Sequence, residues 1–390
     1  MQPFGFAYNK PLIDGLLRNE MGFKGYINSD TGIVHNMCWG VEMLDKPERI
    51  GFAVNNSGVD VISGNFDRAL GLEAYARNTN DYYDTHEVPE GFTKEQLVLT
   101  DEVLNRAVSR TLQGMFELGL FEDTYRDPKV AVEVAATQSD WDNAMDAHRK
   151  SVTLLKNDGI LPLTTDKLEG KKVYAEAFHQ SPEKAVELTK GLKEMLTDVT
   201  LVDDPAQADY ALLMLNPKSG AYFSATKGYL ELDICEGKMV ADVDEFCRPE
   251  SSTHEETTLA GANRISKIAA AVRANGGKVI ANVNVVLAWL LGNVEPHVDA
   301  LTLGYDTYPS SILDVYFGRF SPVGKLPITM PKNDAVLAVN ADGVCISPND
   351  VPGYDKDLYM PEELKDENGK AYAYRDAAGN YYEMNFGLTY

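Results

Sequence analysis

The feature that most constrains this chain is the alternation of short apolar segments with longer amphipathic ones. Residues 12–21 place apolar side chains at helical spacing, and a glycine turn then leads into a short apolar strand at 26–30. Helices are also predicted over 46–57 and 101–118, and a second buried strand over 59–63. Strands that alternate with helices are typical of α/β proteins with a parallel sheet.

The same alternation predicts how the chain is divided. It occupies residues 1–120, is lost over 121–140 and resumes over 141–340. We therefore expect a first α/β domain, a linker and a second α/β layer structure. The last segment, 341–390, is rich in Tyr, Asp and Gly, and we expect it to pack on the domains as an extension.

In the second domain we expect a helix from Trp141 to about Lys156 and further helices over 183–196 and 260–274. Five strands are predicted between and after these helices, over residues 172–178, 199–202, 208–215, 278–285 and 300–305. Residues 216–258 lack periodicity and contain Gly, Pro and acidic residues, which predicts a long loop of the kind that serves a site.

Composition and charge exclude several classes of function. The formal net charge of −23 argues against nucleic acid as a partner, because a phosphate backbone attracts clustered Lys and Arg. No apolar run reaches the roughly 18 residues of a membrane span, and no signal peptide is visible. We expect a soluble protein, cytoplasmic or secreted. The four cysteines have no CxxC spacing and no metal or nucleotide motif occurs, so no metal ion or cofactor is expected.

The strongest chemical signal lies where the first strand ends. The segment from Asn19 to Asp30 is a helix, a glycine turn and a strand that deliver the Asp30 carboxylate to the strand's C-terminal end. In a (β/α)8 barrel that end forms the active face. Spacing alone leaves two interpretations open: Asp30 takes part in a reaction, or it caps the helix that follows. Asp60, in the second strand, is a candidate to support this site.

The segment that ends at Asp30 is similar to a motif of glycoside hydrolase family 3, LR-x-E-x-GF-x-G-x-x-x-SD, whose final Asp is the nucleophile. Further segments resemble family motifs in the family's order, at residues 39–42, 57–60, 107–110, 116–121, 151–157, 161–163, 317–318, 321–327 and 385–390. The chain thus resembles the C-terminal part of the family: the end of a (β/α)8 barrel over 1–120, followed by an α/β sandwich domain.

The resemblance implies a retaining β-glycosidase, most commonly a β-glucosidase that acts on small oligosaccharides or β-glucosides. One carboxylate attacks the anomeric carbon to give a covalent glycosyl-enzyme, and a second carboxyl group protonates the leaving oxygen and then activates water. Such carboxyl groups lie about 5–5.5 Å apart. The resemblance assigns the nucleophile to Asp30 and requires no metal. His35 and Trp39 are candidates for contacts with the sugar.

The sequence departs from the family pattern at both catalytic positions. Thr31 follows Asp30 where the family has Trp. The family's acid/base Glu lies on a loop of the second domain, and one alignment places Ala225 there. Glu231 is a nearby carboxyl group and is our candidate acid/base, with three alternatives on the same insertion: Glu236, Glu255 and Glu256.

The barrel part is also short, with about three βα units where a complete barrel has eight. Half a barrel exposes an unpaired strand edge. We therefore expect a separate polypeptide, or a second copy, to complete it. Two other functions remain open: a catalytically silent, carbohydrate-binding fragment, and a related exo-hydrolase for β-xylosides or N-acetylglucosaminides.

Overall fold

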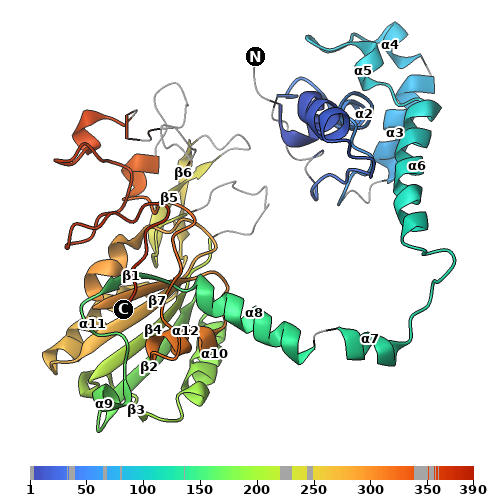
Figure 1. Ribbon diagram of the computed structural model, residues 1–390. Coiled ribbons are helices and arrows are strands. Elements are labelled where there is room, and N and C mark those ends of the chain that lie inside the picture. The colour runs from blue at the N-terminus through green and yellow to red at the C-terminus, as the bar shows by residue number, and fades with distance from the viewer. Residues whose placement is uncertain are drawn as a thin grey trace. The chain divides into compact units, whose positions relative to one another are not determined.

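The structure is a computed structural model that describes residues 4–32, 34, 40–64, 68–79, 81–135, 137–219, 231–243, 249–337, 350, 355, 357–358 and 360–390. The chain forms two compact units, residues 1–135 and 136–390 (Figure 1). The division falls inside the segment that the sequence predicts as a linker.

The first unit is mostly helical. The predicted helix at 12–21 is confirmed as the π-helix η2 (Pro11–Glu20), and the one at 101–118 as α6 (Asp101–Glu117). The one predicted at 46–57 consists of α2 (Lys46–Gly51) and the π-helix η3 (Phe52–Asn56). The other helices that the structure describes in this unit are η1 (Phe6–Tyr8), α3 (Arg68–Thr79), α4 (Tyr82–Thr85), α5 (Lys94–Leu97) and α7 (Pro128–Val134).

Local sequence explains where these helices begin and end. Asp45 and Glu48 form a capping box at the start of α2, each side chain accepting a hydrogen bond from the other's backbone N–H. The Thr100 hydroxyl caps α6 by accepting a hydrogen bond from Val103 N–H. Gly58 follows η3 at φ +85°, a left-handed conformation that glycine adopts without steric cost. The apolar faces of these helices meet in one core around Phe52.

The second unit contains a six-stranded sheet with the order β1-β8-β7-β4-β2-β3. All neighbouring strands are parallel except β1 (Thr153–Asn157), which runs antiparallel to β8. The five strands predicted from the sequence are confirmed within two residues at each end: β2 (Lys172–His179), β3 (Thr200–Val202), β4 (Tyr210–Asn216), β7 (Lys278–Asn284) and β8 (Ala300–Gly304). The predicted α/β fold class is confirmed by this mainly parallel sheet.

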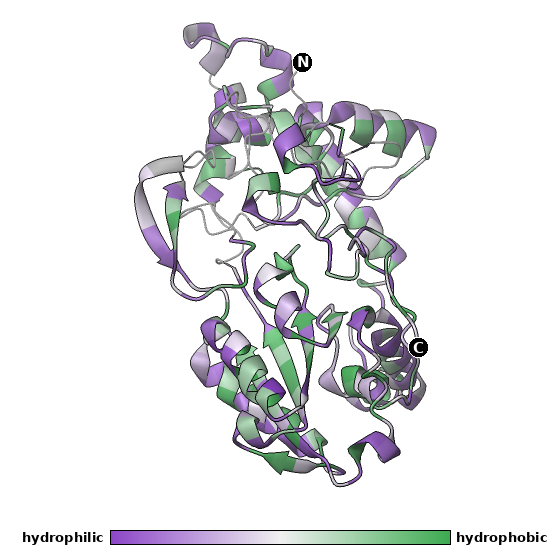
Figure 2. Cartoon of the chain, turned by 90° about the vertical axis from the view of Figure 1, so that its left-hand side faces the viewer, coloured by the Kyte–Doolittle hydropathy of each residue, from purple (hydrophilic) through white to green (hydrophobic). Residues whose placement is uncertain are grey.

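Helices cover both faces of this sheet. Helix α11 (Ile265–Ala274) packs on one face, and α10 (Pro182–Met195) and α12 (Pro309–Tyr316) pack on the other (Figure 1). The central strands are hydrophobic along most of their length, as Figure 2 shows. Strands buried on both faces read as continuous apolar runs, which is why they were predictable.

Helix α8 (Gln138–Ser151) precedes β1 in the chain. The shorter helices described in this unit are α9 (Thr165–Leu168), η4 (Pro205–Gln207), η5 (Ala262–Arg264), η6 (Leu291–Asn293), η7 (Glu295–His297), η8 (Asp334–Leu337) and η9 (Glu362–Leu364). None of the described helices in either unit has the length and apolar character needed to span a bilayer.

Two predictions for this unit are wrong. The helix predicted to reach Lys156 ends at Ser151, because Leu154 and Leu155 are fully buried and the chain pairs with β8 instead. The predicted loop at 216–258 contains a two-stranded antiparallel hairpin, β5 (Lys238–Val243) and β6 (Pro249–Glu256). Its strands are polar and acidic, so their sequence carries little of the apolar alternation by which half-buried strands are recognised.

The C-terminal residues belong to the second unit. Leu388 N–H donates to the carbonyl of Leu154 on β1 at 2.7 Å, and Leu326 N–H donates to the carbonyl of Phe386 at 2.8 Å. The phenol of Tyr390 donates to the carbonyl of Val315 at the end of α12. The chain end thus adds to the β1 edge of the sheet.

Candidate active site

The strands predicted at 26–30 and 59–63 are not found as strands among the described residues of the first unit; a single parallel bridge between Asn28 and Val61 joins the two segments and positions Asp30. Ser29 N–H donates to the carbonyl of Val61 at 2.9 Å, and Gly32 N–H donates to the carbonyl of Ser63 at 3.0 Å. These hydrogen bonds lie on either side of Asp30, so its backbone is fixed between the two bridged segments. Asp30 lies two residues beyond the bridge residue Asn28, at the end of the segment where the sequence predicts a strand.

The side chain of Asp30 is exposed, and its Oδ1 accepts a hydrogen bond from Thr31 N–H at 2.7 Å. Ser29, which precedes it, is buried; its hydroxyl accepts from Ser63 N–H at 3.0 Å and donates to the Asp30 carbonyl at 3.1 Å. The backbone of Asp30 is thus anchored while its carboxylate faces solvent. That combination suits a group that must meet a substrate.

Both interpretations of Asp30 stay open. A cap would be recognised from residues 33 and 35–39, which lie outside the described residues. The two candidates for sugar contacts, His35 and Trp39, also lie outside them, and their roles stay predictions.

The side chain of Asp60 is only 1% exposed and lies next to the bridged segments. Its carboxylate accepts hydrogen bonds from Arg18 Nη2 at 2.7 Å, from Arg110 Nη1 at 3.0 Å and from Ile27 N–H at 2.8 Å. Arg18 Nη1 in turn donates to the carbonyl of Gly25 at 2.9 Å. Asp60 therefore ties η2, α6 and the first strand together, and it supports Asp30 through the backbone rather than by contact.

Burial and the nearby positive charge of Arg110 lower the pKa of Arg18 from its usual value, and Asp60 opposes that shift. Arg18 remains charged at neutral pH because an arginine pKa begins so high. The three side chains form one buried ionic cluster with a single negative charge between two positive ones.

Glu231, the candidate acid/base, belongs to the second unit and is only 1% exposed. Its Oε1 accepts a hydrogen bond from Asp233 N–H at 2.7 Å, and its Oε2 lies 3.1 Å from Lys238 Nζ. Lys238 also pairs with Asp334 at 2.9 Å and with Asp233 at 3.4 Å. Glu231 is therefore one of three carboxylates around a single ammonium group.

Charge balance explains the titration of this cluster. Burial lowers the pKa of Lys238, but hydrogen bonds to Asp334 and Glu231 and the surrounding negative charges raise it by more. Burial raises the pKa of Asp233, with Glu231 adding to that shift and Lys238 opposing it. Lys238 is thus a stable cation that holds β5 against the segments on either side.

The alternative acid/base candidates have different surroundings. Glu236 accepts a hydrogen bond from Gly261 N–H at 2.9 Å, Glu256 lies 3.3 Å from His254 Nε2, and Glu255 is exposed on β6. Ala225, the position that one alignment matches to the family's Glu, lies outside the described residues. Among the residues that the structure describes, no three His, Cys, Asp or Glu side chains are arranged to hold a metal ion.

The fold and these motifs match one family. The model of the glycosyl hydrolase family 3 C-terminal domain matches residues 152–390, well over half of the chain. The chain belongs to glycosyl hydrolase family 3. The family domain begins at β1 and includes the whole sheet and the C-terminal residues that pair with it.

Curated relatives extend the likeness into the first unit. A probable beta-glucosidase C of Aspergillus flavus is 26% identical over 354 residues, which cover 87% of this chain and 47% of the relative. A periplasmic beta-glucosidase/beta-xylosidase of Dickeya chrysanthemi is 27% identical over 355 residues, covering 85% of this chain and 45% of the relative. This family 3 chain therefore spans about half the length of the curated relatives it matches.

Solved structures show the same fold. The structure of a beta-glucosidase from Listeria innocua in complex with isofagomine matches with a TM-score of 0.59 and 20% identity, covering 98% of this chain and 50% of that one. The beta-glucosidase EmGH1 from Erythrobacter marinus matches with a TM-score of 0.58 and 18% identity, covering 98% of this chain and 50% of that one.

Sequence reasoning missed the cations at both positions. Arg18 and Arg110 stand in amphipathic helices, where a charged side chain is usually solvated, and only the buried Asp60 between them reveals their role. The role of Lys238 could not be predicted from the sequence either, since its partner Asp334 lies 96 residues further along the chain. In this family 3 chain, the sequence signal for the cluster of Asp60 with Arg18 and Arg110 was the position of Asp60 as a single acidic residue in an apolar segment.

Proposed function

We propose that this chain provides the nucleophile of a retaining β-glycosidase, and that Asp30 is that nucleophile. The observation that carries the proposal is the exposed Asp30 carboxylate on a backbone anchored just after the parallel bridge between Asn28 and Val61. A carboxylate in that position can attack an anomeric carbon while the protein holds the backbone still. Membership of family 3 supports the reaction class.

The proposed substrate is a small β-glucoside. The Aspergillus and Dickeya relatives carry beta-glucosidase in their names, and the Dickeya relative also carries beta-xylosidase. A β-xyloside is therefore the first competing substrate to test. Hydrolysis proceeds by double displacement, with a glycosyl ester on Asp30 as the intermediate.

Glu231 is the proposed acid/base. A general acid must carry a proton before the first displacement. The Glu231 carboxyl group is paired with Lys238 at 3.1 Å, so for Glu231 to act, Lys238 must move away when substrate binds. For the alternatives Glu236, Glu255 and Glu256, a role as acid/base requires less rearrangement of the neighbouring side chains.

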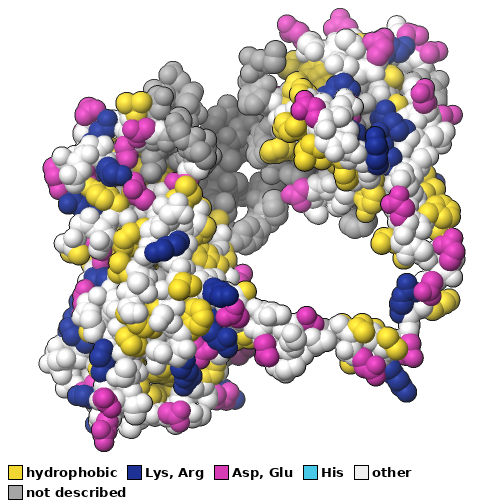
Figure 3. Space-filling view, viewed as in Figure 1, with side chains coloured by type: hydrophobic (Ala, Val, Ile, Leu, Met, Phe, Trp, Pro, Cys, Tyr) yellow, Lys and Arg dark blue, Asp and Glu magenta, His cyan; other side chains and the backbone are white. Residues whose placement is uncertain are grey.

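We also propose that activity requires further βα units from another polypeptide or a second copy. The chain spans about half of its relatives. Hydrophobic side chains are exposed over the first unit (Figure 3), among them Met21 at 70% and Phe116 at 57%. Exposed apolar side chains in such number are typical of a surface that another segment covers.

Hydrolysis of an aryl β-glucoside and an aryl β-xyloside tests the proposal. The chain is assayed alone and mixed with a polypeptide carrying the missing βα units. Asp30→Asn is compared with Asp123→Asn, an exposed carboxylate of the same unit. An activated 2-fluoro-β-glucoside should trap a covalent adduct on Asp30, located by peptide mass. An adduct on another residue would refute the assignment of the nucleophile.

A second function, a catalytically silent carbohydrate-binding subunit, is favoured by the ion pair that occupies Glu231. The same experiment separates the two. If neither the chain nor the mixture hydrolyses either substrate, yet both bind the free sugar, the silent subunit is the better description.

A further inference from the structure

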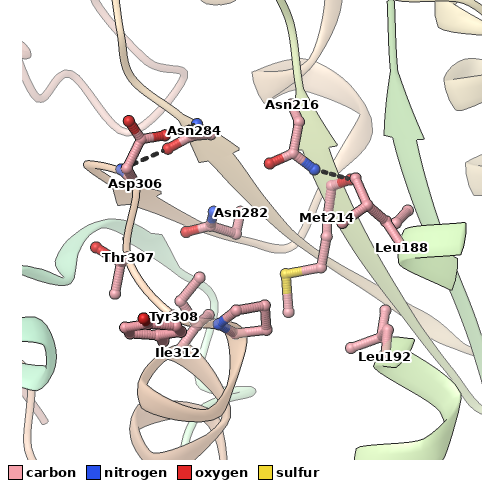
Figure 4. Close-up of a pocket in the computed structure, with 12 residues that line it drawn as sticks. Leu188, Leu192, Met214, Asn216, Asn282, Asn284, Asp306, Thr307, Tyr308 and Ile312 are labelled. Atoms are coloured by element: carbon pink, nitrogen blue, oxygen red, sulfur yellow. Dashed lines mark hydrogen bonds between the residues drawn. The ribbon is translucent and has the colours of Figure 1, made fainter. Parts of the chain in front are cut away.

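The second unit contains a cavity of about 200 Å3 that the proposed reaction does not use. It lies between helices α10 and α12, above the carboxyl ends of β4 and β7 (Figure 4). Pockets for drug-sized ligands measure about 300–1,000 Å3. This one therefore has room for a molecule the size of one sugar ring.

The sheet topology places the cavity where α/β folds bind ligands. From β2 the chain passes through α10 to β3 on one side, and then returns to β4 on the other side of β2. In open α/β sheets, ligands bind outside the carboxyl ends of strands at such a reversal of strand order. Ala177 of β2 and Met214 of β4 are paired between these two adjacent strands, and both line the cavity.

A polar side chain stands in the otherwise apolar floor. Asn282 on β7 is only 4% exposed, and its Oδ1 accepts a hydrogen bond from Thr302 Oγ1 at 3.0 Å. Its neighbour across the sheet, Met214, is apolar. Gly304 leaves space for this amide, since a Cβ there would lie 3.3 Å from Asn282 Nδ2. A buried amide in a strand is costly unless its polar atoms are used.

The rim carries a second amide and a carboxylate in a strained position. Asn284 Nδ2 donates to Asp306 Oδ1 at 2.8 Å, and Asp306 N–H donates to Asn284 Oδ1 at 2.8 Å. This double hydrogen bond holds Asp306 at φ +50°, a left-handed conformation uncommon for residues other than glycine. Strain of this kind persists at binding and catalytic sites, where it serves to aim a side chain.

The rest of the lining is mostly apolar or aromatic, with the Asn216 amide and the Thr307 hydroxyl as further polar groups. Leu188 and Leu192 of α10 and Ile312 of α12 close the lower sides (Figure 4). Tyr308 stands at the rim, with Trp141 packed beside it at 5.6 Å between ring centres. Asp306 is the one carboxylate among the twelve described residues that line the cavity, and none of the twelve is Lys or Arg.

We propose that this cavity binds an uncharged polyhydroxyl compound the size of a single sugar ring. The amides of Asn282 and Asn284 can each donate and accept, which suits neighbouring hydroxyl groups, and the Asp306 carboxylate accepts from a further hydroxyl. The apolar floor and the rim of Tyr308 match the C–H face of such a ring. An anion lacks a cationic partner in this lining. The site does not depend on the proposed role of Asp30.

The test is the binding of D-glucose and D-xylose to the full chain, followed by calorimetry and by the NMR signals of the Asn282 and Asn284 side-chain amides. Saturable binding that shifts these amides is expected. Asp306→Gly keeps the left-handed backbone without strain and should weaken binding about tenfold, the effect of one lost hydrogen bond to a charged group.

Two further variants locate the effect. Ala177→Leu fills the floor and should abolish binding, with the circular dichroism spectrum reporting that the unit is folded. Asp203→Asn, an exposed carboxylate after β3, is the matched control and should bind like the parent. The proposal would be overturned if all variants bind equally, or if no saturable binding is found. It would also be overturned if the cavity binds inorganic phosphate and not the sugars. Glycosidase activity of the parent chain is scored separately, so either result can fail alone.

Discussion

The carboxylate of Asp60 and the guanidinium of Arg18 form an ion pair of 2.7 Å, with their side chains 1% and 8% exposed. Asp60 also accepts a hydrogen bond from Ile27 N–H, in the segment that ends at Asp30. The nucleophile candidate therefore rests on a buried electrostatic cluster, and its position depends on a residue it does not touch.

Asp60→Asn should destabilise the first unit by about 3–5 kcal/mol, because it leaves the buried Arg18 and the partly buried Arg110 without their anion. Amide hydrogen exchange of the first unit during urea titration measures the loss. The control is Asp84→Asn, which breaks the exposed Lys94–Asp84 pair and should change little. Equal effects of the two variants would contradict the buried cluster.

Lys238→Met tests the second cluster. It removes the ammonium group that lies among Glu231, Asp233 and Asp334, so three carboxylates lose their shared cation, and a loss of about 3 kcal/mol in the stability of the second unit is expected. Chemical unfolding measures it. Glu231→Gln in the same background should recover part of the loss, because a neutral amide needs no counter-ion. If the double variant is no more stable than Lys238→Met, the ion pair is not what holds this region together.

The fold was predictable where local sequence and burial agree. Strands β4 and β7 are apolar along most of their length, so their type and approximate length follow from the sequence alone. Strand β1 was mistaken for the end of a helix, because its pairing with β8 joins residues about 150 positions apart. No local pattern distinguishes a short apolar run in a strand from the same run in a buried helix.

The candidate site was predictable only in part, for a related reason. The backbone next to Asp30 is fixed by hydrogen bonds to Val61 and Ser63, about 30 residues further along the chain. The glycine turn before Asp30 predicts that the chain extends at this point. The cation beside Glu231 comes from β5, in a segment whose polar strands resemble a loop. Side-chain partners brought together by the tertiary fold leave no mark at either position in the sequence.

The C-terminal residues should contribute directly to the stability of the second unit. Deleting 386–390 removes the hydrogen bond from Leu388 N–H to Leu154 and the stacking of Phe386 on Tyr382, whose ring centres lie 5.5 Å apart. A loss of at least about 3 kcal/mol is expected from these contacts and the apolar area that they bury. Thermal unfolding measures it, with Thr389→Ala as the control. Unchanged stability after the deletion would show that the chain end is dispensable.

Tyr390 should make the second unit sensitive to alkali. Burial raises the pKa of Tyr390 to about 12, above its usual value of 10.0. Because the folded pKa is the higher one, the neutral phenol favours the folded state below pH 10, and this contribution declines as pH rises from 10 towards 12. Tyr390→Phe loses the hydrogen bond to Val315 at neutral pH but is spared this decline. The stability difference between parent and variant should therefore shrink over that interval in urea unfolding, whereas Tyr125→Phe, an exposed tyrosine, should follow the parent at every pH. A difference that stays constant from pH 8 to 12 would mean that the Tyr390 phenol ionises in the folded chain as readily as in the unfolded one.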